Sequence, residues 1–113
     1  MILDFWATWC GPCVRALPIV SEVAAAYKDK GVVFYAVNEQ EESDAVKKFL
    51  AAKKLDIAVA MDAEGEAAKL YKVNGIPQTV IIGKDGKVAV VHVGFSPSMK
   101  QMLTKELDAL LAK

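Results

Sequence analysis

WATWCGPCVRALP, residues 6–18, contains both cysteines of the chain, separated by a Gly-Pro pair and preceded by Trp9. It overlaps the end of MILDFW, residues 1–6, a short apolar segment that predicts a buried strand. From Cys10 as far as Tyr27, apolar residues recur at helical spacing and predict a helix. Cys10 is therefore expected where a strand ends and a helix begins.

This position favours a reactive thiol at Cys10. The free amide groups and the dipole of a helix N-terminus favour negative charge, and they lower the pKa of a thiol placed there. Cys13 follows about one helical turn later on the same side, within disulfide reach. Gly11 and Pro12 restrict the connection, and Trp9 supplies a flat apolar wall. The spacing suits thiol–disulfide exchange, in which Cys10 attacks a substrate disulfide and Cys13 resolves the mixed disulfide.

Length and composition fit one folded domain spanning residues 1–113, and they exclude several functions. Lys and Arg together number 14, as do Asp and Glu, so no basic excess indicates nucleic acid or an acidic membrane surface. The longest apolar runs are too short to span a bilayer. No secretory signal precedes the first predicted strand, so any membrane anchor is expected to lie outside this sequence.

The cysteine count narrows the chemistry further. Two cysteines are too few for the disulfide framework of a small secreted scaffold, or for a closed zinc site with four ligands. Two other interpretations stay open: a pair of buried structural cysteines, and a copper or zinc carrier that uses Cys10 and Cys13, with His92 as a further ligand. We expect a redox pair that needs no bound metal or other cofactor.

The rest of the chain alternates predicted strands and helices. Asp-Gly at residues 85–86, between two β-branched runs, predicts a hairpin turn. Pro18 is expected to kink the first helix. The order βαβαβα followed by ββα predicts an α/β fold with a mixed sheet flanked by helices. We expect strands at 1–6, 31–37, 55–61, 79–83 and 88–93, and helices at 10–27, 44–53 (capped by Ser43), 64–73 and 97–113 (capped by Ser96, with Pro97 at its first position).

DFWATWCGPC, residues 4–13, resembles the active-site segment of thioredoxins, and GIPQT, residues 75–79, resembles their cis-proline loop. An extra helix–strand unit at about 43–61 is similar to the TlpA/ResA-like branch, as are VNEQEE and IIGKDGKV. The branch's usual N-terminal hairpin is absent. The resemblance implies a thioredoxin-like fold in an extracytoplasmic, monomeric reductase. Its partners would be disulfide-containing proteins and an upstream dithiol electron donor.

The resemblance also implies roles for residues outside the motif. The Ile76–Pro77 bond would be cis and face the cysteines, leaving the Ile76 backbone free to pair with an extended substrate. Gly94 resembles the glycine that floors the substrate groove. A thiol peroxidase is the alternative enzyme of this fold, but it needs a Thr-x-x-Cys setting, and Thr8 is not placed for it.

Two acids are candidates for the general base. Asp4 matches the buried acid of ordinary thioredoxins, and burial in an apolar strand should raise its pKa and let it take a proton from Cys13, directly or through water. Glu41 stands three residues after Asn38, where the TlpA/ResA-like branch often keeps an active-site acid. The sequence leaves the choice between Asp4 and Glu41 open.

Overall fold

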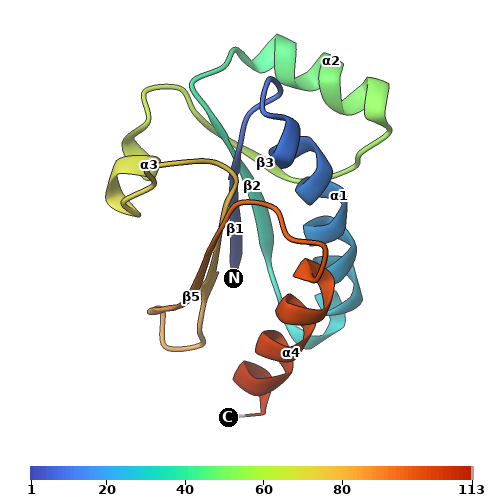
Figure 1. The fold of residues 1–113 in the computed structure, drawn as a ribbon, viewed down its shortest axis with the longest axis vertical. Coiled ribbons are helices and arrows are strands. Elements are labelled where there is room, and N and C mark those ends of the chain that lie inside the picture. Colours follow the sequence, from blue (N-terminus) through green and yellow to red (C-terminus); the bar gives the residue numbers. More distant parts are fainter. Residues whose placement is uncertain (113) are drawn as a thin grey trace.

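In the computed structural model, which describes residues 1–112, the chain forms five strands and four α-helices, which alternate up to the fourth strand (Figure 1). A short 3-10 helix, Lys28–Lys30, follows the first α-helix. The elements are β1 (Ile2–Trp6), α1 (Gly11–Ala26), β2 (Phe34–Glu39), α2 (Ser43–Lys53), β3 (Val59–Asp62), α3 (Glu66–Leu70), β4 (Gln78–Ile82), β5 (Val88–Val93) and α4 (Met99–Leu111).

The strands form one mixed sheet in the order β3-β2-β1-β4-β5. β1 and β3 both run parallel to β2, whereas β4 runs antiparallel to β1 and to β5. All of β1 is buried because it is the central strand. The carboxyl ends of β1, β2 and β3 meet at one edge, where open α/β sheets place their functional loops.

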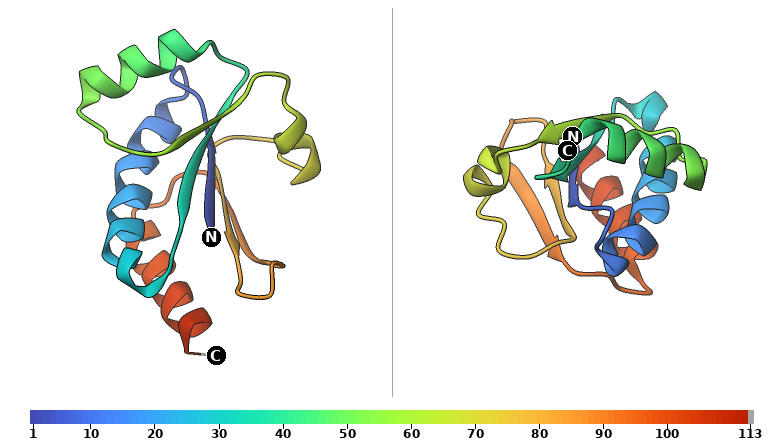
Figure 2. Two further views of the ribbon diagram at one scale, coloured as in Figure 1. Left: turned by 180° about the vertical axis from the view of Figure 1, so that it is seen from behind. Right: turned by 90° about the horizontal axis from the view of Figure 1, so that it is seen from above.

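Alternation along β1 divides the core between the two faces of the sheet. Ile2 and Trp6 face α1, with α4 packed beside Ile2 and α2 beside Trp6. Leu3 and Phe5 face the opposite side, where α3 covers the sheet. Figures 1 and 2 show this division, with α1, α2 and α4 on one side and α3 on the other. Asp4 has the same parity as Ile2 and Trp6, so its side chain points toward α1.

The α/β class, the mixed sheet and the additional helix–strand unit at α2 and β3 are confirmed. The first helix runs through Pro18 without interruption but begins one residue after Cys10 and ends at Ala26. The second strand starts at Phe34 rather than residue 31. Gly31, at φ +87°, terminates the short 3-10 helix, and Val32 N–H still bonds the Tyr27 carbonyl at 3.3 Å.

Several other predicted boundaries were wrong for similar reasons. Ser43 is the first helical residue of α2 and not its cap, because the Glu42 carbonyl already accepts the Val46 N–H. The last helix starts at Met99 rather than Pro97. The Met99 N–H donates a hydrogen bond to the Ser96 carbonyl at 3.0 Å, so residues 96–99 form a turn before the helix. The predicted strand 55–61 is β3 at 59–62, and the predicted helix 64–73 shortens to α3 at 66–70.

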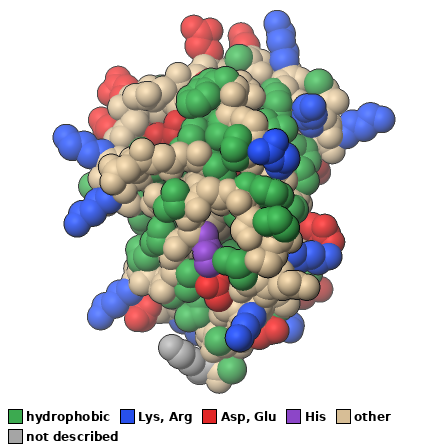
Figure 3. Space-filling model, in the orientation of Figure 1, with side chains coloured by type: hydrophobic (Ala, Val, Ile, Leu, Met, Phe, Trp, Pro, Cys, Tyr) green, Lys and Arg blue, Asp and Glu red, His purple; other side chains and the backbone are tan. Residues whose placement is uncertain are grey.

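Among the described residues, no helix combines the length and apolar character needed to cross a membrane. On the face drawn in Figure 3, basic and acidic side chains are interspersed around the periphery, and apolar side chains gather between them.

Candidate active site

The two cysteines form a disulfide at the start of α1, with their Cα atoms 5.2 Å apart. Cys10 is the N-cap residue, and its Sγ accepts a hydrogen bond from the Cys13 N–H at 3.3 Å. Cys10 is 6% exposed, whereas Cys13 is fully buried. A sulfur that already accepts a first-turn N–H is placed where a thiolate would be stabilised.

A tight turn delivers the chain from β1 to this cap. The Cys10 N–H donates to the Ala7 carbonyl at 3.2 Å, so residues 7–10 close a turn between strand and helix. Trp9 lies in that turn and is 73% exposed. Gly11 and Pro12 are also exposed. The disulfide is thus bordered by an exposed surface that a substrate can reach.

The loop before β4 lies against the disulfide. The Ile76–Pro77 peptide bond is cis, and the Ile76 carbonyl oxygen lies 3.7 Å from the Cys10 Sγ. The Pro77 carbonyl accepts a hydrogen bond from the Gly94 N–H at 2.7 Å. Gly94 has φ +87°, a conformation that side-chain-bearing residues rarely adopt. The fold therefore brings residues 76, 77 and 94 together beside Cys10.

Asp4 is fully buried in the middle of β1. Its Oδ1 accepts a hydrogen bond from Thr79 Oγ1 at 3.3 Å, across the antiparallel pair of β1 and β4. Oδ2 is buried and accepts no hydrogen bond from any residue that the structure describes. Burial raises the pKa of the Asp4 carboxyl to about 7, although the Thr79 hydrogen bond acts in the opposite direction.

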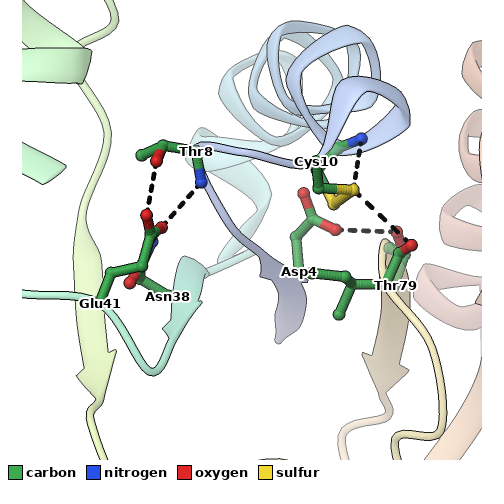
Figure 4. The surroundings of a disulfide bond; sticks show 8 residues. Asp4, Thr8, Cys10, Asn38, Glu41 and Thr79 are labelled. Carbon is green, nitrogen blue, oxygen red and sulfur yellow. Dashed lines mark hydrogen bonds between the residues drawn. A yellow bond between two sulfur atoms is a disulfide. The ribbon is translucent and has the colours of Figure 1, made fainter.

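The Asp4 carboxyl lies on the cysteine side of the sheet. In Figure 4 it sits just below the disulfide. Trp6, which projects from the same face of β1, packs in one cluster with Cys10 and Cys13. A carboxyl group with a pKa near neutrality in this place can exchange a proton with a nearby thiol.

Glu41 lies on the other side of the segment between β1 and α1. Its Oε1 accepts hydrogen bonds from the Thr8 N–H at 2.7 Å and from Asn38 Nδ2 at 2.8 Å, and its Oε2 accepts one from Thr8 Oγ1 at 2.5 Å. Burial alone would raise the pKa of Glu41, but these hydrogen bonds lower it below its ordinary value. Figure 4 shows its carboxylate directed at Thr8.

Two further acids, neither singled out by the sequence analysis, meet at the carboxyl ends of β2 and β3. Glu39 and Asp62 are paired in register. Burial and the neighbouring Asp62 carboxyl raise the pKa of Glu39 to about 8. Burial opposes ionisation of Asp62, yet hydrogen bonds from Glu39 and from backbone amides, including those of Ala67 and Ala68, lower its pKa. The pair therefore favours a protonated Glu39 beside an ionised Asp62.

The metal-carrier interpretation finds no matching donor set. His92 lies on β5, and its Nε2 is 2.6 Å from Glu106 Oε1 on α4. Among residues 1–112, no group of three or more His, Cys, Asp and Glu side chains is arranged to hold a metal ion.

Comparison with known proteins assigns the family. The family model described as Redoxin matches residues 1–111. The chain belongs to the redoxin family. It is 42% identical over 88 residues to the thiol-disulfide oxidoreductase ResA of Bacillus thuringiensis subsp. konkukian, an alignment that covers 78% of this chain and 51% of that protein. This redoxin therefore spans about half the length of that curated relative.

Solved structures agree with this assignment. A Chlorobium tepidum protein described as a thiol:disulfide interchange protein DsbE is 41% identical, with a TM-score of 0.90, and the match covers 97% of this redoxin and 78% of that chain. A secreted Mycobacterium tuberculosis disulfide oxidoreductase is 26% identical, with a TM-score of 0.79, and the match covers 96% of this redoxin and 80% of that chain. The thioredoxin-like fold is thereby confirmed, and the family is one of thiol–disulfide oxidoreductases.

Proposed function

We propose that this redoxin reduces disulfide bonds in proteins through a reversible Cys10–Cys13 dithiol. The observation that carries the proposal is the position of the disulfide. Cys10 caps a helix, its Sγ accepts the Cys13 N–H, and Cys13 is buried beneath it. The ResA relative, named a thiol-disulfide oxidoreductase, supports the same chemistry.

In the reaction, the Cys10 thiolate attacks one sulfur of a substrate disulfide and forms a mixed disulfide, releasing the other substrate sulfur as a thiolate. The Cys13 thiolate then attacks the Cys10 sulfur and releases the second substrate sulfur as a thiolate. Two electrons pass to the substrate, and the enzyme is left with the Cys10–Cys13 disulfide seen here. An upstream dithiol donor must return two electrons for the next turnover.

Asp4 is proposed as the base for the second step. Cys13 must lose its proton before it can attack, and it is fully buried. The buried Asp4 carboxyl, with a pKa of about 7, can take this proton directly or through water. A group whose pKa lies near the working pH is best suited to that exchange.

The substrate is proposed to lie as an extended peptide between Trp9 and the loop of Ile76, Pro77 and Gly94. The Ile76 backbone lies next to the Cys10 sulfur, where it can pair with a peptide strand. Gly11 and Pro12 are proposed to border this surface, because they directly follow Cys10 and are exposed. The substrate is therefore recognised mainly through its backbone, which suits a reductase of varied proteins.

An extracytoplasmic location is proposed on the basis of relatives, one of which is described as secreted. We propose that the protein acts as a monomer and receives electrons from a dithiol partner.

A trapping experiment tests the function. The Cys13→Ser variant, offered oxidised insulin as a substrate, should accumulate a mixed disulfide through Cys10, because the resolving thiol is missing. The Cys10→Ser variant should trap none, and the unmodified protein should reduce insulin catalytically with dithiothreitol as donor. Absence of both turnover and trapped adduct would overturn the proposal.

A further inference from the structure

Glu41 joins two loops that follow neighbouring parallel strands. Asn38, at the end of β2, is fully buried and pairs in register with Trp6, the last residue of β1. Thr8 lies two residues after Trp6 and donates to Glu41 through both its N–H and its hydroxyl. Since Asn38 is fixed in the sheet, the carboxylate connects Thr8 to a rigid part of the fold.

Thr8 occupies the first central position of the turn at residues 7–10. In such a turn the central N–H groups are not used by the closing hydrogen bond, which here joins the Cys10 N–H to the Ala7 carbonyl. Glu41 supplies the acceptor for the Thr8 N–H at 2.7 Å. Charge-assisted bonds of this length are among the stronger hydrogen bonds in proteins. The turn is thus held at both its closing bond and its centre.

The orientation of Cys10 depends on this turn. Cys10 has an extended conformation, φ −94° and ψ 106°, and its carbonyl accepts the Val14 N–H at 3.0 Å as the first hydrogen bond of α1. In this conformation the side chain folds back over the first turn, and its sulfur accepts the Cys13 N–H at 3.3 Å. A shift of the turn would therefore move the sulfur away from the donor that stabilises its thiolate.

Glu41 is poorly suited to act as a base. Its two oxygens already accept three hydrogen bonds, from Thr8 and Asn38. Those same bonds overcome the effect of burial and keep its pKa below the ordinary value, so it stays ionised at neutral pH. In Figure 4 its carboxylate faces Thr8, and Asp4 is the acid beside the disulfide.

We infer that Glu41 is a positioning residue: by holding Thr8 it fixes the turn at residues 7–10, and so keeps the Cys10 sulfur against the Cys13 N–H. This inference rests on the proposed function, because it concerns the reactivity of the same thiol. It assigns Glu41 a role different from the one suggested by its family resemblance.

Two substitutions at Glu41 distinguish positioning from proton transfer. In Glu41→Gln the amide oxygen can still accept from the Thr8 N–H and Asn38, and the amide NH₂ can donate to the Thr8 hydroxyl. Glu41→Ala removes all three interactions. We expect Glu41→Ala to slow alkylation of Cys10 by iodoacetamide at pH 7 by about tenfold, since small misplacements of a reacting group have effects of this size or larger. Glu41→Gln should stay within about threefold of the unmodified protein.

The pH profile of alkylation, measured on each reduced variant, adds a second readout. Glu41→Ala should raise the apparent pKa of Cys10 by about one unit, which corresponds to the tenfold effect. Glu42→Ala is the matched control, because Glu42 is an exposed neighbouring acid with no side-chain cap bond, and it should change neither value. Thr8→Val, which keeps the N–H but loses the hydroxyl, should give an intermediate rate even if Glu41→Ala fails to fold.

The inference is overturned if Glu41→Gln is as slow as Glu41→Ala, which would indicate a base. It is equally overturned if Glu41→Gln and Glu41→Ala both react faster than the unmodified protein, which would indicate an effect of charge alone. A Glu41→Ala variant that reacts at the rate of the unmodified protein would also overturn it, as would a Thr8→Val variant that does so if Glu41→Ala does not fold. Alkylation measures the thiol without any protein substrate. A failure of the proposed reductase activity would therefore leave this test intact.

Discussion

Asp4 and Glu41 are both carboxyl groups close to the segment that carries Cys10, yet their surroundings differ in kind. Asp4 is fully buried in a strand, with one oxygen bonded to Thr79 and the other without a donor among the described residues. Glu41 is partly exposed in a loop and accepts three hydrogen bonds. Burial without donors raises a carboxyl pKa, whereas several donors lower it. The fold thus raises the pKa of Asp4 and lowers the pKa of Glu41.

The contributions of Asp4 and Glu41 to the free energy of unfolding should depend on pH in opposite directions. The pKa of Asp4 is raised, from an ordinary 3.8 to about 7, so its contribution to stability is complete below pH 3.8 and is lost as the pH rises through 7. The pKa of Glu41 is lowered, so its contribution is present above its unfolded value and is lost as the pH falls through its folded value.

The largest expected effect is on stability. Asp4→Asn should raise the free energy of unfolding at pH 8 by roughly 3 to 4 kcal/mol, because it removes the cost of ionising a buried acid. Below pH 4 it should have little effect. Chemical denaturation of the oxidised protein at pH 4 and pH 8 measures both values, and equal changes at the two pH values would show that Asp4 does not titrate in this range.

The same substitution should slow disulfide exchange. Loss of a general base typically lowers a rate by a factor of about 100 or more. We expect insulin reduction by Asp4→Asn to fall by about this factor at pH 7, and to recover toward pH 10, where Cys13 ionises unaided. Stopped-flow measurement of the resolving step over this range is the check. A rate equal to that of the unmodified protein at every pH would remove Asp4 from the mechanism.

Glu41→Ala should lower the free energy of unfolding by about 1 to 2 kcal/mol at pH 7, as expected for lost hydrogen bonds to a charged group. Below the folded pKa of Glu41 the difference should shrink, since a protonated carboxyl group accepts these bonds less well. Thermal unfolding of Glu41→Ala and of the control Glu42→Ala, measured at a series of pH values from 7 downward, tests this. A difference in stability that begins to shrink above the ordinary carboxyl pKa of Glu41 would contradict the assigned charge state.

The smallest effect is expected at Glu39. Its pKa is raised to about 8 by burial and by Asp62, so its ionisation disfavours the native state as the pH rises from about 4.5 through 8. Glu39→Gln should therefore make stability less dependent on pH over that range, in the same direction as Asp4→Asn but by less, because Glu39 is partly exposed. Combining Glu39→Gln with Asp4→Asn should make the free energy of unfolding still less dependent on pH. A steeper dependence on pH would refute the raised pKa of Glu39.

The sequence predicted the strand–helix junction at Cys10 because local patterns decide it: an apolar run, a helical period and two cysteines. It misplaced the beginnings of β2 and β3, because residues 31–33 and 55–58 are largely apolar although they lie in loops. Only the pairing of Phe34 with Ile2, and of Val59 with Ala36, sets where each strand begins. Register of this kind depends on contacts between distant segments and not on local composition.

The candidate site shows the same limit. Asp4 and Glu41 were identified from the sequence, but their hydrogen-bond donors were not. Thr79 reaches Asp4 through the antiparallel pairing of β1 and β4, across 75 residues of chain. Thr8 reaches Glu41 only because β1 and β2 end side by side. Since such donors decide the charge of each acid, the sequence could not choose between Asp4 and Glu41.

The central claim is that Cys10 is the attacking thiol and Cys13 the buried resolving thiol. Brief treatment of the reduced protein with iodoacetamide at pH 7, followed by mass spectrometry of its peptides, measures the relative reactivity of the two directly. The account predicts that Cys10 is modified at least about tenfold faster, because it is the more accessible sulfur and it caps the helix. Equal labelling, or faster labelling of Cys13, would contradict it.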